Sequence, residues 1–330
     1  MKLLVLDQYS DPGGGQQQLL DLLPAFAECG WNATVAMPGH GAMFARVREL
    51  GFEAARLNWS VLHSAADLVY INGPRCLPFA GLAGVEAPVI FHAHRTLTGW
   101  KWKMAGESVR RLKARVIGVC RYVADPWCAY AEHVSVVYNG VAGTAPATLP
   151  HDPPVVGCIG RIAPEKGQLE FIDAAAKIHA AMPGCRFVIY GAPLFGSAAA
   201  ARYEAEVRAA ARDLPVEFAG WVDDVYAALA GMDLLLVPSG EDEATTRVIL
   251  EAFAAGVPAI AFPAGGIPEV IEEGVDGMLA GSAPDMAAKA LGLLKDSERL
   301  QAMSRAARLT WERRFTLDRF RREVIAVIKG

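Results

Sequence analysis

The sequence predicts an α/β protein of two doubly wound domains, and three observations support that prediction. Its 330 residues are more than one hydrophobic core usually holds, which favours two domains of about 150 residues each. Short apolar runs alternate with helical patterns, as in the βαβ units that build parallel sheets. The alternation stops at residues 141–154, which are rich in Ala, Pro, Thr and Gly and typical of a linker.

Each half supplies its own set of predicted elements. Before the linker, strands are expected at 3–6, 33–37, 68–71, 89–91, 116–119 and 134–137, with helices at 16–28 and 42–50. After it, strands are expected at 155–159, 186–190, 216–218, 234–237 and 259–262, with helices at 167–181, 199–213, 223–230 and 247–255. Ligands bind outside the carboxyl ends of such strands, so polar residues that follow strands are the candidates for function.

Composition excludes several classes of protein. The net charge of −4 gives no global attraction to nucleic acid. The apolar runs are far shorter than the roughly 20 residues that span a bilayer. The first residues, Met1 to Leu6, meet Asp7 and predict a strand, not a signal peptide, so a cytoplasmic chain is expected. Six scattered cysteines without a C-x-x-C pair indicate buried thiols in a reducing compartment.

Two polar segments follow strands in the first half. Gly13-Gly14-Gly15 precedes a helix, where backbone N–H groups can approach a phosphate. Gln18 stands where the dinucleotide fingerprint needs a glycine, so a phosphate loop and a plain turn are equally supported. His92, His94 and Arg95 follow the strand at 89–91. They form either a polar group at a binding site or ordinary histidines, and no third ligand at a familiar spacing favours zinc.

The third segment, residues 160–167, opens a helix after the strand at 155–159. Arg161 and Lys166 place two cations at this turn, which favours binding of an anion such as a phosphate. The alternative is a solvated pair that bonds to nearby acids such as Glu165.

The fourth segment, residues 238–258, is the densest in candidates. Glu243 stands before a helix that Thr245 or Thr246 could cap and that Gly256 could end. Glu251 lies inside that apolar helix and needs a hydrogen-bond donor, either ribose or sugar hydroxyls or an arginine. The acidic run 241–243 could instead bind a metal ion, but no second carboxylate cluster supports that. Gly265 and Gly266 are expected to open a further helix.

In order and spacing, these motifs resemble those of the retaining glycosyltransferases of family 4, and the resemblance covers nearly the whole chain. The matching residues are Gly14-Gly15, Asn139-Gly140-Val141, Gly160-Arg161, Lys166-Gly167, Phe218–Asp224, Glu243 with Glu251-Ala252, Gly256-Val257-Pro258, and Gly265-Gly266 with Glu269. Three positions depart from the family pattern: Thr245 and Thr246 replace Phe-Gly, and Cys120 replaces a serine.

The resemblance implies the GT-B fold, two Rossmann-like domains that face each other across a cleft. Residues 1–145 would bind the acceptor, 152–312 would bind a UDP or GDP sugar, and 313–330 would form a helix that crosses back to the first domain. The implied reaction retains the anomeric configuration, requires no metal or other cofactor, and uses a saccharide or lipid-linked acceptor.

The resemblance also implies roles for individual residues. Arg161 and Lys166 would stabilise the diphosphate leaving group, with Glu243 on the donor sugar and Glu251 on the ribose. His94 would contact the transferred sugar near the reacting carbon. The remaining substrate-binding residues would be Gly14, Gly15, Gly220, Thr245, Thr246 and Arg247.

Three alternatives stay open from the residues. A nucleotide-sugar epimerase or hydrolase would share the architecture but would need its own acid and base, for which no convincing set is present. An inactive binding module would not need the full set of Arg161, Lys166, Glu243 and Glu251. The basic and aromatic segment from Trp100 to Arg115 could face a membrane surface, or it could be an ordinary helix with a solvated basic face.

Overall fold

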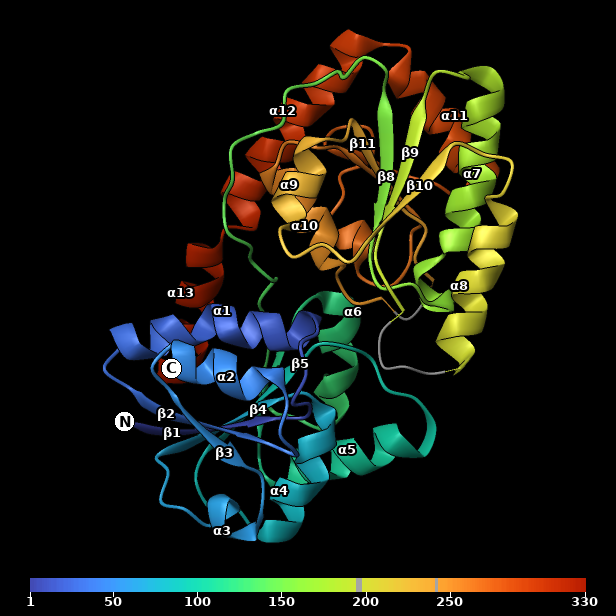
Figure 1. Ribbon diagram of the computed structural model, residues 1–330. Helices are drawn as coiled ribbons and strands as arrows, with labels where there is room; N and C mark the ends of the chain where they lie inside the picture. Colours follow the sequence, from blue (N-terminus) through green and yellow to red (C-terminus); the bar gives the residue numbers. More distant parts are fainter. Residues whose placement is uncertain (194–197, 241–242) are drawn as a thin grey trace. The chain divides into compact units, whose positions relative to one another are not determined.

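The computed structural model describes residues 1–193, 198–240 and 243–330, and the chain forms two compact units. Unit 1 consists of residues 1–140 and 317–330, and unit 2 consists of residues 141–316. Each unit has one parallel sheet with helices on both faces (Figure 1). The predicted α/β class with two Rossmann-like domains is therefore confirmed.

Unit 1 contains a seven-stranded sheet in the order β3-β2-β1-β4-β5-β6-β7. Its strands are β1 (Lys2–Asp7), β2 (Asn32–Met37), β3 (Glu53–Arg56), β4 (Leu68–Asn72), β5 (Val89–Ala93), β6 (Arg115–Gly118) and β7 (Val134–Val136). Its helices are α1 (Gly14–Glu28), α2 (Ala42–Glu49), α3 (Trp59–Leu62), α4 (Leu77–Ala83), α5 (Gly99–Arg111), α6 (Arg121–Ala124) and α13 (Leu317–Lys329), with 3-10 turns η1 (Pro74–Cys76) and η2 (Asp125–Ala129).

Apolar side chains are buried on both faces of this sheet, as expected when helices cover both sides. Residues such as Val5 and Tyr70 pack under α1, α2 and α13 in one core cluster. Phe320 and Val324 of α13 belong to that cluster, so the end of the chain completes the core of unit 1. Helices α4 and α5 lie on the opposite face (Figure 1).

Unit 2 contains a six-stranded sheet in the order β10-β9-β8-β11-β12-β13. Its strands are β8 (Val155–Ile159), β9 (Arg186–Tyr190), β10 (Val216–Gly220), β11 (Leu234–Val237), β12 (Ala259–Ala261) and β13 (Gly277–Leu279). Its helices are α7 (Gln168–Ala181), α8 (Ala198–Ala210), α9 (Val225–Ala230), α10 (Arg247–Ala254), α11 (Ala283–Leu294) and α12 (Ser297–Arg314), with 3-10 turns η3 (Pro164–Lys166) and η4 (Ile267–Glu269).

The main core of unit 2 lies between its sheet and helices α7, α8 and α11. Phe171, Phe187 and Leu236 are among its fully buried members. On the other face, α10 is buried along nearly its whole length, from Val248 to Ala254. That burial fixes where the first residues of α10 lie, at the carboxyl end of β11.

The structure differs from the prediction at several elements, and helices α11 and α12 are among those that were not predicted. Strands β3 and β13 were not predicted, because β3 carries charges at both ends and β13 has three residues. The predicted helix after Gly265 and Gly266 is wrong: the chain makes the single 3-10 turn η4 there and no α-helix. Most other strand and helix ends shift by one to three residues, as termini usually do.

Two findings bear on the surroundings of the protein. In the part of the chain that the structure describes, no helix is long and apolar enough to cross a membrane. Four of the six cysteines are buried, as predicted for thiols that pack as small apolar groups; Cys29 is half-buried and Cys128 is exposed.

Candidate functional site

In each unit the strand order reverses next to the first strand, and the candidate residues gather at that point. In unit 2, β8 lies between β9 and β11, so the loops that follow β8 and β11 leave the sheet in opposite directions. In unit 1, β1 lies between β2 and β4 in the same way. Ligands of open α/β sheets bind at such switch points.

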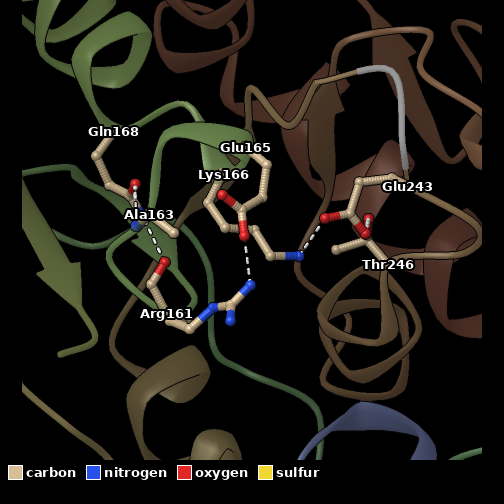
Figure 2. Close-up of polar contacts among 7 residues, drawn as sticks. All are labelled: Arg161, Ala163, Glu165, Lys166, Gln168, Glu243 and Thr246. Atoms are coloured by element: carbon tan, nitrogen blue, oxygen red, sulfur yellow. Dashed lines mark hydrogen bonds and ion pairs between the residues drawn. The ribbon is translucent and has the colours of Figure 1, made fainter. Parts of the chain in front are cut away.

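The turn after β8 carries the two predicted cations of unit 2. Arg161 follows the strand, and its guanidinium forms an ion pair with the Glu165 carboxylate (Figure 2). The Arg161 carbonyl accepts a hydrogen bond of 2.9 Å from Nε2 of the buried Gln168. The buried Gln168 side chain therefore holds the backbone of this turn, while the Arg161 guanidinium stays about one-third exposed.

Lys166 ends this turn and reaches the loop that follows β11. Its ammonium forms an ion pair with the Glu243 carboxylate, and both side chains are largely buried, with exposed fractions of 23% and 16% (Figure 2). The two residues are 77 positions apart in sequence. The pair thus joins the loops of the two strands that flank the switch point of unit 2.

Gly167 allows these loops to approach. Its φ of +69° lies in the left-handed region, and a Cβ there would stand 1.9 Å from the carbonyl oxygen of Pro238, after β11. The N–H of Gly240 also donates to the Glu165 carbonyl, at 2.9 Å. A side chain at position 167 would separate the loops that carry Lys166 and Glu243.

The Glu243 carboxylate has a second partner at the start of α10. The Thr246 hydroxyl donates to it at 3.3 Å, and Thr246 is the N-cap residue of α10. Of the two threonines predicted to cap the helix, Thr246 takes the cap position, but its hydroxyl bonds to Glu243 and makes no side-chain cap bond. Gly256 takes the predicted left-handed conformation after the helix, with φ of +67°.

Glu251 pairs with an arginine, which is one of the two kinds of partner expected for it from the sequence. Nε of Arg247 donates to the Glu251 carboxylate at 2.7 Å, one helical turn away, and Glu251 is 9% exposed. The pair lies on α10 among buried apolar neighbours. A carboxylate has about four acceptor positions, so an acid held at this depth by one turn of helix can also accept hydrogen bonds from a ligand.

The remaining predicted residues of unit 2 are Thr245 and Gly220. Thr245 is buried beside Thr246. Gly220 ends β10 with φ of +78°, and its carbonyl accepts from the N–H of Gly191 at 2.7 Å. Glu241 and Asp242 lie outside the described residues. Among residues that the structure describes, no group of three or more His, Cys, Asp or Glu side chains could hold a metal ion.

In unit 1 the structure brings together Gly15 and His94. Gly14 is the first residue of α1 and lies in open space, because a Cβ added to it would meet no atom within 4 Å. A Cβ on Gly15 would lie 3.5 Å from the His94 ring, in ordinary contact. The glycine loop and the predicted histidine are therefore neighbours at the switch point of this unit.

A buried polar network behind His94 was not predicted from the sequence. Nε2 of His94 lies 2.6 Å from Oδ1 of Asn72, and Nδ2 of Asn72 donates to Asp7 at 2.6 Å and to the Gly15 carbonyl at 3.2 Å. Asp7 also accepts from Gln16 at 2.8 Å and from the Tyr9 N–H at 2.9 Å. The signal was present, since Asp7 and Asn72 are polar residues that end β1 and β4 and pair in register.

Burial shifts the protonation of this network. Burial lowers the pKa of His94 to about 4, so its imidazole is neutral at neutral pH. Burial and the nearby His94 hold the pKa of His92 well below its usual range. Burial also raises the pKa of Asp7, although hydrogen bonds from Tyr9, Asn72 and Gln16 oppose that shift.

Unit 1 also has an apolar pocket and an exposed aromatic face near this region. The pocket has a volume of about 360 Å³ and is lined by Thr96, Leu97, Trp102, Val123, Pro126, Trp127 and Ala129. Trp102 packs on Trp127 with ring centroids 4.4 Å apart. Trp100 in contrast is 68% exposed, and Phe79 and Leu82 of the adjoining α4 are also exposed. The two tryptophans of α5 thus have different surroundings.

Comparisons with known proteins agree with the motifs on both sides of the linker. Residues 12–142 match a family model described as Glycosyltransferase Family 4, and residues 153–296 match one described as Glycosyl transferases group 1.

Curated relatives match part of the chain. A GDP-mannose-dependent monoacylated alpha-(1-6)-phosphatidylinositol monomannoside mannosyltransferase of Corynebacterium glutamicum is 35% identical over 166 residues, which are 47% of this chain and 42% of that protein. A D-inositol 3-phosphate glycosyltransferase of Segniliparus rotundus is 34% identical over 216 residues, 58% of this chain and 46% of that protein. The chain thus covers less than half the length of these relatives.

Solved structures match the whole chain at lower identity and show the fold. Anabaena HepE, solved in complex with UDP and glucose, has a TM-score of 0.88 and 24% identity, and the match covers 100% of both chains. A mutant of S. aureus TarM has a TM-score of 0.83 and 11% identity, and the match covers 100% of both chains. The chain therefore consists of two glycosyltransferase domains, of Family 4 in residues 12–142 and of group 1 in residues 153–296, and has the GT-B type of fold.

Proposed function

We propose that this protein transfers a sugar from a UDP or GDP sugar to a saccharide or lipid-linked acceptor, with retention of the anomeric configuration and without a metal ion. The observation that carries the proposal is the meeting of Lys166 and Glu243 at the switch point of unit 2, beside the start of α10. The Lys166 ammonium and the Glu243 carboxylate therefore lie beside a helix N-terminus, at the place where an open α/β sheet binds its ligand.

The chemistry of the donor explains why both charges are needed. Transfer breaks the bond between the anomeric carbon and a diphosphate, so negative charge grows on the leaving group and positive charge on the sugar. Arg161 and Lys166 stabilise the first, and the Glu243 carboxylate stabilises the second. In the protein without ligand both cations pair with carboxylates, and an incoming diphosphate gives each cation a new anionic partner.

The nucleoside is assigned to α10. Glu251 accepts hydrogen bonds from the ribose hydroxyls while Arg247 holds its carboxylate in place. Thr245, Thr246 and Gly220 complete the binding surface around the diphosphate. Relatives named for GDP-mannose and a structural neighbour solved with UDP support a nucleoside diphosphate of either base.

Unit 1 contributes the glycine loop, His94 and the acceptor side. Gly14 and Gly15 offer backbone N–H groups to phosphate oxygens, and the neutral His94 imidazole contacts a sugar. The pocket beside Trp102 and Trp127 supports binding of the acceptor, because aromatic rings pack well against the apolar faces of sugars and lipid chains.

The face formed by α4 and α5 supports a peripheral contact with an anionic membrane on the cytoplasmic side. Exposed Trp100, Phe79 and Leu82 lie there with exposed cations of α5, namely Lys101, Lys103, Arg110 and Arg111. The protein carries a net charge of −4, so these cations are a local feature that matches the negative surface of a membrane.

The proposed function is tested by incubation with radiolabelled UDP and GDP sugars, candidate acceptors, and EDTA. We expect labelled product whose anomeric configuration, determined by NMR, equals that of the donor, at a rate that EDTA leaves unchanged. Nucleotide release without product would indicate a hydrolase, and an altered donor sugar would indicate an epimerase. Binding without turnover of any acceptor would indicate an inactive module.

A further inference from the structure

The network behind His94 determines which of its ring nitrogens can meet a ligand. We infer that Asn72 and Asp7 are positioning residues that hold His94 as the Nε2–H tautomer, so that Nδ1 is presented as an acceptor for a sugar hydroxyl. The hydroxyl partner rests on the proposed function, whereas the tautomer follows from the protein alone.

The orientation of the Asn72 amide is the first step. One atom of that amide lies 2.6 Å from an Asp7 oxygen and 3.2 Å from the Gly15 carbonyl. The Gly15 carbonyl can only accept a hydrogen bond, so this atom must be the amide nitrogen whatever the protonation of Asp7. The opposite orientation would place the amide oxygen against two acceptors in a site where Asp7 and Asn72 are 0% and 1% exposed.

The tautomer of His94 follows from that orientation. The Asn72 oxygen faces Nε2 of His94 at 2.6 Å and can only accept, so Nε2 must carry the proton. Since a neutral imidazole has one protonated nitrogen, Nδ1 is left with a lone pair. Neutrality is supported by the burial that lowers the pKa of His94 to about 4. The titratable groups around it are His92, with ring centroids 4.3 Å apart, Asp7 behind Asn72, and the adjacent exposed Arg95.

Nδ1 is also available. Within residues 1–193, 198–240 and 243–330, no hydrogen-bond partner of Nδ1 is found, and the atom is not among the buried side-chain atoms that lack a partner. An accessible lone pair at the switch point of unit 1, beside the open Gly14, matches a ligand that donates hydrogen bonds. A hydroxyl is the donor that a sugar supplies, whereas a phosphate oxygen would be repelled.

This buried network serves to fix the orientation of the His94 ring. The two hydrogen bonds that the Asn72 amide donates link three separate segments of unit 1, namely β1, β4 and the start of α1. Asp7 is in turn held by Gln16 and Tyr9. A ring fixed by such a chain of hydrogen bonds need not reorganise when the substrate arrives, which is how supporting groups contribute to rate.

The test is NMR of the full chain with ¹⁵N-labelled histidine at neutral pH, in which His94→Gln identifies the His94 signals among the seven histidines. We expect a pyrrole-type Nε2 and a pyridine-type Nδ1. A protonated Nδ1, or signals averaged between the tautomers, would overturn the assignment. This readout requires no activity, so it is separate from the test of the proposed function.

Ligand additions then locate the hydroxyl. A shift of Nδ1 with UDP-glucose or GDP-mannose, absent with UDP or GDP alone, would place the hydroxyl on the donor sugar. A shift of Nδ1 that appears only when the acceptor substrate is added would place the hydroxyl on that substrate. No shift with any of them would disprove the acceptor role of Nδ1.

A variant tests the positioning role. Asn72→Leu keeps the volume but removes the amide, so we expect averaged His94 tautomers and at least a tenfold lower kcat, with nucleotide affinity changed less than twofold. An unchanged kcat would contradict the role. Should the variant not fold, the wild-type spectrum still decides the tautomer.

Discussion

The two switch points have the same place in their sheets and opposite chemistry. In unit 2 the loops after β8 and β11 are joined by charges, Lys166 with Glu243. In unit 1 the loops after β1, β4 and β5 are joined by an amide and a neutral imidazole, Asn72 and His94. Charge suits a ligand group that is itself ionic, and a neutral network suits one that is polar and uncharged. This difference agrees with the proposed roles, in which the charged residues of unit 2 bind the diphosphate and His94 of unit 1 meets a sugar hydroxyl.

Removal of the cation in unit 2 gives the largest expected effect. Lys166→Ala leaves the Glu243 carboxylate without its ammonium and deprives the leaving group of a cation, so kcat should fall about 100- to 1,000-fold. Initial rates at saturating donor measure this. Lys177→Ala is the control, since Lys177 lies on α7 in an exposed pair with Asp173. Equal rates for the two variants would remove the proposed role of Lys166.

The second effect concerns donor affinity. Glu251→Ala removes a charged hydrogen-bond acceptor for the ribose, which typically contributes about 1.5–3 kcal/mol, so Kd for the nucleotide should rise roughly 10- to 100-fold. Isothermal titration with UDP and GDP measures it. Glu204→Ala is matched, because Glu204 pairs with Arg208 one turn away on the surface of α8. If donor affinity is unchanged in Glu251→Ala, the assignment of the ribose to α10 fails.

The third effect tests the basic face of unit 1. Lys103→Gln removes one exposed cation from α5, and at about 1 kcal/mol per cation near an anionic surface the partition into phosphatidylserine vesicles should fall roughly fivefold. Co-sedimentation measures the partition, with Lys177→Gln in unit 2 as the control. Equal binding of wild type to neutral and anionic vesicles would speak against the proposed contact.

The last effect is on stability, and it follows from the neutral imidazole of unit 1. The pKa of His94 falls from its usual value of 6.5 to about 4 in the folded protein. Between these values the unfolded chain binds a proton that the folded chain does not, so stability is highest above about pH 6.5 and decreases as the pH falls toward 4. His94→Gln should reduce this decrease.

Melting temperatures from neutral pH down to about pH 4 test that expectation. The exposed His63 provides the control variant, His63→Gln. Parallel curves for wild type and His94→Gln would show that His94 does not carry the pH dependence.

The sequence predicts the fold better than it predicts the network of unit 1. Apolar runs and their alternation with helical patterns predict both sheets, because burial on both faces leaves a strong signal. Residues with long charged side chains after strands, such as Arg161, Lys166 and Glu243, are also visible in the sequence. Their pairing is not, because it depends on β8 and β11 being neighbours in the sheet.

Asp7 and Asn72 show why the polar network of unit 1 was not predicted from the sequence. At the end of a strand, Asp and Asn are usually turn residues, so each alone indicates a loop. Their role becomes visible when β1 and β4 are placed in register, which brings the two residues opposite each other. The helical partner of Glu251 was also undecided from the sequence, although Arg247 stands four residues before it.

The membership of α13 in unit 1 has a consequence for the synthesis of the protein. The core of residues 1–140 includes Phe320 and Val324, both fully buried. During synthesis, all of unit 2 therefore leaves the ribosome before α13 can complete the core of unit 1. Until then the apolar side of α1 stays exposed, although unit 2 can already fold. A nascent chain stalled before residue 317 would expose that apolar surface and would be the form most in need of a chaperone.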